Sequence, residues 1–131
     1  MKKSIFLVAL IFLIFQSFGQ EKGCPILPTP VTYQTTNEFI SIPKTITVDT
    51  TNLSLNNFNQ LIEHGKTYHN LNFTLSKEQS LIVFRKLKNV KEDSYSINVG
   101  DNIIISYSSQ RSCYFAIHSL MQLIQGKEQE L

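Results

Sequence analysis

The sequence contains short runs in which apolar and polar residues alternate, and two longer runs in which apolar residues recur every three or four positions. Alternation is typical of a half-buried strand, and three- to four-residue spacing is typical of an amphipathic helix. The helical spacing covers residues 56–68 and the stretch that follows Ser109. We therefore expect the order strand, strand, helix, strands, helix. The strand patterns occur at 38–42, 45–49, 71–75, 81–84, 94–99 and 103–107.

Turn and capping residues separate these elements. Residues 43–44 join the first two strand patterns, and 100–102 join the last two into the clearest hairpin of the sequence. Gly65 is expected to mark the weak C-terminal turn of the first helix, and the serines at 108–109 are candidates to cap the second. This order predicts an α+β fold: a largely antiparallel sheet of four or five strands with two helices packed on one face.

The second helix has one apolar stripe and one polar face. We expect the stripe to be buried against the sheet. Its members are Cys113, Ala116, Ile117, Leu120, Met121 and Ile124, whereas His118, Gln122 and Gln125 lie on the polar face.

The N-terminus has the composition of a secretory signal peptide. Two lysines precede an uninterrupted apolar run over residues 5–15, and Ser17 and Gly19 are the small residues that a signal peptidase reads. We therefore expect residues 1–19 to be cleaved before Gln20 and the chain to be exported, to the periplasm, the outer surface or the medium.

Two other interpretations of this segment are weaker. A membrane anchor needs about 20 apolar residues, roughly twice this run, so no stable span is expected after cleavage. A lipid on Cys24 would require an apolar residue and small residues before it, and 21–23 are Glu-Lys-Gly. Prolines recur within 20–30, which is therefore expected to be an extended segment leading into a domain over 31–125.

Charge argues against some partners. The chain has 12 Lys and Arg against 10 Asp and Glu, and two of the lysines belong to the leader. The mature chain is then neutral, whereas binding to nucleic acid or an anionic membrane requires clustered positive charge. We therefore expect no nucleic-acid partner.

The cysteines and histidines leave one question open. Export would place Cys24 and Cys113 in an oxidising compartment, where they could form a disulfide. A buried free thiol at Cys113 is equally consistent with its apolar helical surroundings. His64, His69 and His118 have no paired-ligand spacing with these cysteines, so neither a metal nor a cofactor is expected.

No catalytic residues stand out. The sequence lacks a Gly-x-Ser-x-Gly elbow, a phosphate-binding glycine loop and a His-Glu-x-x-His motif. Its adjacent acidic pair, Glu92 and Asp93, lies in a charged connector where carboxylates remain solvated. From the residues alone, the chain is an exported domain without an evident active site.

Four segments nevertheless carry recognisable motifs. Residues 26–30 read I-L-P-T-P, 93–97 read D-S-Y-S-I, 103–109 read I-I-I-S-Y-S-S and 113–124 read C-Y-F-A-I-H-S-L-M-Q-L-I. In this order they resemble the patterns I-P-x-P, E-x-Y-x-L/I, I-x-I-x-A and x-F-Y-A-x-Q-T-L-x-Q-L. These belong to the non-catalytic N-terminal domain of family 20 glycoside hydrolases, the β-N-acetylhexosaminidases. The departures are Ser112, where the family usually has glycine, and Tyr107, where alanine is common.

The resemblance implies an accessory domain that packs against a (β/α)8 barrel holding all the chemistry. In the family an Asp-Glu pair on the barrel works with the substrate's own acetamido group, and this chain has no such pair and no Trp. No catalytic residue is therefore transferred. Residues 126–131 would begin the linker to the barrel.

Two functions follow from the resemblance. The chain is expected to be the accessory domain of an exported β-N-acetylhexosaminidase, truncated or split from its barrel, which is then its partner in trans or in a longer reading frame. The alternative is a free-standing exported binding or interaction module. In the first case an apolar docking surface should be exposed near Tyr114, Phe115 and Met121.

Overall fold

The structure, a computed structural model, describes residues 32, 34, 39–90 and 92–125. The predicted helices and the predicted hairpin are confirmed, with bounds shifted by one or two residues. The leader, the extended segment and Cys24 lie outside the described residues. The elements are β1 (Thr45–Asp49), α2 (Leu55–His69), β2 (Asn72–Leu75), β3 (Ile82–Lys86), β4 (Tyr95–Val99), β5 (Ile103–Tyr107) and α3 (Gln110–Gln125).

The α+β class is confirmed, but the prediction of a largely antiparallel sheet is wrong. The described strands form one five-stranded sheet in the order β2-β1-β3-β5-β4. The β1/β2, β1/β3 and β3/β5 pairs are parallel, and the β4/β5 hairpin alone is antiparallel. The short connections suggested hairpins, yet β3 starts level with the end of β2, because both Leu75 and Ile82 pair with Val48. This stagger allows a short loop to join two parallel strands.

The strand expected at 38–42 is also absent, since residues 39–42 have no strand structure. The reason is topological. β1 has β2 on one side and β3 on the other, so neither edge is free to pair with a preceding strand. Thr47 on β1 further secures the β2–β3 loop: its hydroxyl donates to the carbonyl of Gln79 at 2.9 Å and accepts from the amide of Leu81 at 3.0 Å.

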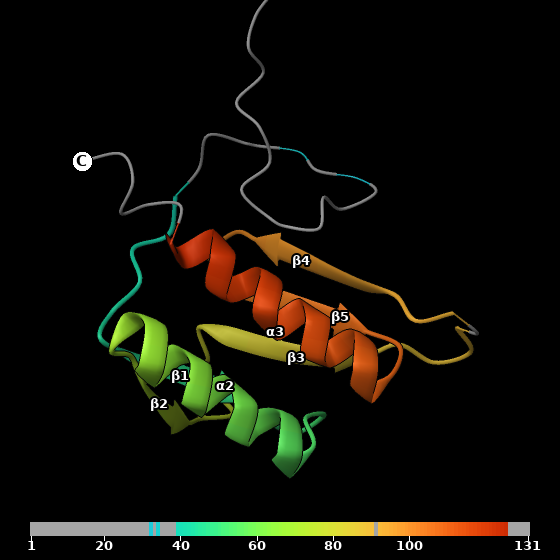
Figure 1. The fold of residues 1–131 in the computed structure, drawn as a ribbon, viewed down its shortest axis with the longest axis horizontal. Coiled ribbons are helices and arrows are strands. Elements are labelled where there is room, and N and C mark those ends of the chain that lie inside the picture. Colours follow the sequence, from blue (N-terminus) through green and yellow to red (C-terminus); the bar gives the residue numbers. More distant parts are fainter. Residues whose placement is uncertain (1–31, 33, 35–38, 91, 126–131) are drawn as a thin grey trace, which may run out of the picture.

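Both helices cover the same face of the sheet, as predicted, and they run side by side in the same direction (Figure 1). The core lies between the two layers. It is formed by inward-facing strand residues and by the apolar stripes of the helices. Burial of their apolar surface is the main source of the stability of the fold. Its fully buried large side chains include Phe84, Ile46, Leu61, Ile82, Ile105, Ile117 and Leu120.

The end of α2 corrects a second expectation. The helix continues through Gly65 to His69, and Asn70 supplies the left-handed C-cap with φ 51°. Gly65 has another role, because a β-carbon there would lie 2.5 Å from Cζ of Phe73 and closer still to Cε2. The missing side chain lets β2 approach the helix. Ser54 caps the start, where its side chain accepts from the amide of Asn57 at 3.2 Å.

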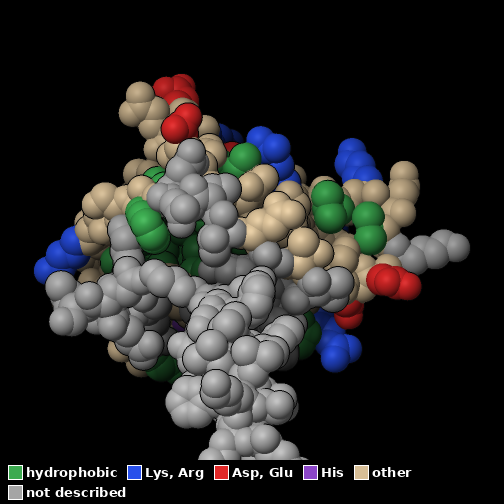
Figure 2. Space-filling view, turned by 90° about the horizontal axis from the view of Figure 1, so that it is seen from above, with side chains coloured by type: hydrophobic (Ala, Val, Ile, Leu, Met, Phe, Trp, Pro, Cys, Tyr) green, Lys and Arg blue, Asp and Glu red, His purple; other side chains and the backbone are tan. Residues whose placement is uncertain are grey.

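The described surface has mixed charge. In Figure 2 the Lys, Arg, Asp and Glu side chains are spread around the rim and do not gather into a patch of one sign. Among the described helices, none is long and apolar enough to cross a membrane.

Candidate functional site

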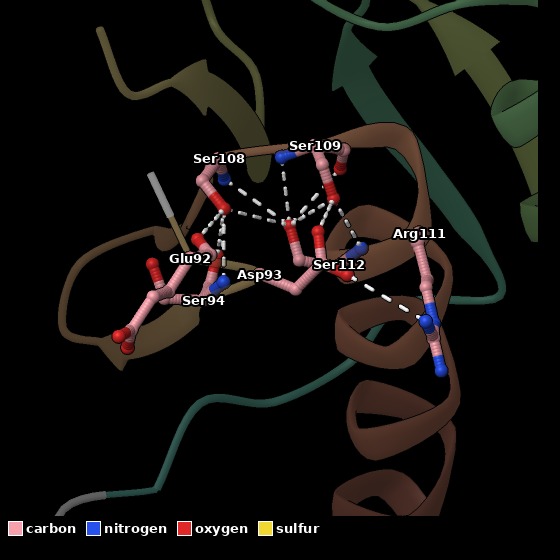
Figure 3. Close-up of polar contacts among 7 residues, drawn as sticks. All are labelled: Glu92, Asp93, Ser94, Ser108, Ser109, Arg111 and Ser112. Atoms are coloured by element: carbon pink, nitrogen blue, oxygen red, sulfur yellow. Dashed lines mark hydrogen bonds and ion pairs between the residues drawn. The ribbon is translucent and has the colours of Figure 1, made fainter. Parts of the chain in front are cut away.

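The acidic pair of the β3–β4 connection is used to fix the start of α3 (Figure 3). The main-chain carbonyl of Glu92 accepts from the Ser108 hydroxyl at 2.7 Å. One carboxylate oxygen of Asp93 accepts from the Ser109 hydroxyl, and the other lies 3.9 Å from Nη1 of Arg111. Asp93 therefore holds a helix N-terminus, where a negative charge is favourable. This arrangement gives the Asp93 carboxylate and the main-chain carbonyl of Glu92 a structural role at the start of α3.

Ser109 and Ser112 complete this cap. The Ser109 hydroxyl accepts from the amide of Ser112 at 3.0 Å, and the Ser112 hydroxyl accepts from the amide of Ser109 at 2.9 Å. The exchange is that of a capping box in which serine replaces the usual Glu or Gln. Ser112 is buried and also accepts from the amide of Ser108 at 3.1 Å, so the prediction that 108–109 would cap the helix is confirmed.

The histidines lie at different places on the two helices. His69 is in the last turn of α2. His64 and His118 meet across the seam between α2 and α3, with ring centroids 4.4 Å apart. Sequence reasoning did not bring these two together. A signal was present, since each helix carries a His and a Tyr four residues apart: His64 with Tyr68, and Tyr114 with His118.

Cys113 is a free, fully buried thiol in the structure. Burial raises the pKa of this thiol to about 11, and a hydrogen bond from Asn57 opposes the shift. A thiol that stays protonated at neutral pH is a poor nucleophile. Cys113 is therefore a core residue in the structure. Cys24, with which it could form a disulfide, lies outside the described part of the chain.

The expected docking residues divide into two groups. Phe115 is 43% exposed and Tyr114 is half-buried. Met121 is 5% exposed and belongs to the core, which confirms its place in the predicted apolar stripe and contradicts its expected place near the docking surface. α3 packs against β4 and β5 on one side and α2 on another, and this packing leaves Met121 covered. Arg111 partly covers the exposed ring, with Cζ 5.7 Å from the Phe115 centroid.

The described residues offer little else for chemistry. A shallow hollow of about 480 Å³ is lined by Phe39, Ile40, Val99, Gly100 and Asp101, and its one carboxylate has no acid–base partner among them. Within the described ranges, no three His, Cys, Asp or Glu side chains are close enough together to hold a metal ion.

Comparison with known proteins identifies the family. The family model for glycosyl hydrolase family 20, domain 2 matches residues 23–131. The chain belongs to this family, and the resemblance to its non-catalytic N-terminal domain is confirmed. No curated protein matches the chain.

A solved structure has the same fold. It is the crystal structure of a GH20 exo-β-N-acetylglucosaminidase from Vibrio harveyi in complex with N-acetylglucosamine, which matches with a TM-score of 0.64 and 24% identity. The match covers 76% of this chain but 16% of that enzyme. The chain thus corresponds to a small part of the larger protein.

Proposed function

We propose that this chain is the accessory domain of an exported β-N-acetylhexosaminidase, an enzyme that removes terminal N-acetylhexosamine from glycans. The match of family 20 domain 2 to residues 23–131 carries the proposal. The catalytic (β/α)8 barrel is a separate polypeptide or a continuation of the reading frame, and this domain docks onto it. The export part of the proposal rests on the leader over 1–19.

The outer face of α3 is the docking surface in this proposal. Phe115 and Tyr114 stand next to each other there, with ring centroids 5.7 Å apart at 68°. Burying a large apolar side chain contributes about 1.5–3 kcal/mol, so an exposed Phe115 beside the half-buried Tyr114 favours association. The face also belongs to the helix that immediately precedes residues 126–131, the start of the expected linker.

The alternative, a free-standing exported interaction module, has two observations in its favour. A domain that never meets a barrel should keep its apolar side chains packed or screened. Met121 is packed, and the guanidinium of Arg111 lies over Phe115. Replacement of the exposed Phe115 distinguishes the two functions. If the chain is a free-standing module, the replacement should leave its association state unchanged.

The proposal predicts that the purified chain does not hydrolyse a chromogenic N-acetyl-β-glucosaminide above the buffer rate. Asp93 is engaged by Ser109 and Arg111 at the start of α3, and both Asp93 and its neighbour Glu92 are exposed to solvent, unlike a buried acid–base pair. The measurement is release of 4-nitrophenol, with Asp93→Asn as the matched control. Turnover by the chain that Asp93→Asn removes would contradict an accessory role.

The export part of the proposal predicts that the intact mass of protein collected after export corresponds to a start at Gln20.

A further inference from the structure

A cluster of four rings joins the two helices beside the proposed docking surface. His64 and His118 lie 4.4 Å apart between centroids and are tilted by 58°. Tyr114 contacts His118 at 4.3 Å, and Tyr68 stacks on His64 at 5.7 Å. We call His64, Tyr68, Tyr114 and His118 the seam cluster. It is continuous with the docking surface, because Tyr114 belongs to both and contacts Phe115.

Among the residues that the structure describes, no ionised group compensates a positive charge in this cluster. In the described part of the chain, the ion pair of Arg111 with Asp93 is at the start of α3, and neither clustered histidine has a carboxylate within ion-pair distance. The nearest charged residues in α2, Glu63 and Lys66, are exposed. The titratable side chains of the neighbouring strands β4 and β5, Tyr95 and Tyr107, bond to the Ser119 hydroxyl and to the carbonyl of Asn52 and contribute no charge.

Charged residues are also missing at the helical positions that contact each histidine. Side chains three and four residues apart are neighbours on a helix. For His64 these neighbours are Gln60, Leu61, Thr67 and Tyr68, and for His118 they are Tyr114, Phe115, Met121 and Gln122.

The environment of His118 disfavours its charged form. Its Nε2 is buried without a hydrogen-bond partner. Burial lowers the pKa of His118, and the nearby His64 lowers it further. Because folding lowers this pKa, the unfolded chain binds the proton more readily. Stability is then greatest above the ordinary histidine pKa of 6.5 and decreases as the pH falls toward the folded pKa.

We propose that the contact between His64 and His118 makes the seam cluster acid-sensitive, so that mild acid loosens the α2–α3 seam and weakens docking of the catalytic barrel. Protonation places positive charge on rings that touch across the seam and that have no counter-ion in the described part of the chain. The rings must separate or become hydrated, and Tyr114 moves with them because it packs on His118. The docking part of this inference rests on the proposed function, whereas the seam part concerns this chain alone.

The seam part is tested on the chain itself. Urea unfolding followed by circular dichroism should show the wild type losing stability between pH 7.5 and 5.5, and NMR titration should place the pKa of His118 below the ordinary histidine value. His64→Gln should raise the pKa of His118 and reduce the pH dependence. His69→Gln, which removes a histidine outside the seam, should leave both unchanged. A pKa of His118 at or above 6.5, or equal pH dependence with His64→Gln, would overturn the inference.

The docking part is tested with the family 20 barrel from the same genome, produced as a separate polypeptide. Binding should be about tenfold weaker at pH 5.5 than at pH 7.5 for the wild type and for His69→Gln. For His64→Gln, binding at pH 5.5 and at pH 7.5 should differ by less than about twofold, because glutamine cannot carry the second positive charge of the seam cluster. Equal weakening in all three chains would refute regulation by the seam. Absence of binding at pH 7.5 would instead refute the proposed function and with it the docking part, while the seam part is still decided by the unfolding and titration.

Discussion

Replacing Phe84 by alanine is expected to lower the free energy of unfolding by about 3–5 kcal/mol, the cost of a large cavity in a packed core. Phe84 lies on β3, between β1 and β5, and is 1% exposed. Its ring meets Tyr107 edge-on at 6.5 Å. These contacts cannot be replaced, because the surrounding strands are fixed by pairing on both sides. A domain of this size has a total stability of about 5–15 kcal/mol, so the variant should be close to unfolding.

Urea denaturation followed by circular dichroism and tyrosine fluorescence measures this loss, since the chain has no Trp. Leu75→Ala is the matched control, because Leu75 is 63% exposed at the edge of the same sheet. It should change the stability by no more than about 0.5 kcal/mol. A cost for Phe84→Ala as small as that of Leu75→Ala would show that the core is not centred on β3.

Replacing Gly65 by alanine should destabilise the domain, although alanine is the better helix former. The gain from helix propensity is about 1 kcal/mol. The new methyl group, however, would overlap the ring of Phe73, which packs against the core cluster. Overpacking of this kind costs about 1–3 kcal/mol, and the overlap involves two ring atoms. We therefore expect a cost in the upper part of this range, about 2–3 kcal/mol, and a net loss of about 1–2 kcal/mol after the propensity gain is subtracted.

A double-mutant cycle isolates this clash from propensity. In a Phe73→Ala background the ring is gone, so Gly65→Ala should increase the unfolding free energy by about 0.5–1 kcal/mol. The measurement is again urea unfolding of the four chains of the cycle. The same destabilisation by Gly65→Ala in both backgrounds would mean that Phe73 is not the reason for the glycine.

The local pattern predicted those parts of the fold that depend on neighbouring residues. The hairpin of β4 and β5 followed from two alternating runs around 100–102, and the α3 stripe followed from its spacing. Both depend on interactions within one short stretch of chain. The serine cap of α3 was predictable for the same reason, because the bonds between Ser109 and Ser112 span three residues.

The errors concern pairings between distant segments. In the sheet, β5 lies between β3 and β4, and β4 is the hairpin partner of β5. No local feature of residues 82–86 indicates that β3 pairs with β5. The run at 39–42 has strand composition but no free edge to pair with. The apolar stripe predicted that Met121 is buried, whereas the docking expectation placed it near the surface, and the packing of α2 beside α3 decides between the two. In each case the missing information was the arrangement of elements in the sheet and helix layers.

The candidate site shows the same division. The His and Tyr pairs at four-residue spacing are visible in the sequence, and each pair lies on one helix. The contact between His64 and His118 joins positions 54 residues apart, so it depends on the tertiary structure. The conclusion that the chain lacks catalytic residues rested on missing motifs and on the family resemblance. The structure adds that the Asp93 carboxylate is engaged at the start of α3.

The central claim is that this domain works by docking onto a family 20 barrel through the outer face of α3. Sedimentation velocity of the chain mixed with the barrel from the same genome, at pH 7.5, tests it most directly. We expect a one-to-one complex that Phe115→Ser weakens by about 30-fold or more, the effect of losing a buried aromatic anchor. Leu75→Ser, an equally drastic change at the opposite edge of the fold, should leave binding unchanged. A chain that remains monomeric beside the barrel, or a complex that Phe115→Ser does not weaken, would contradict the claim.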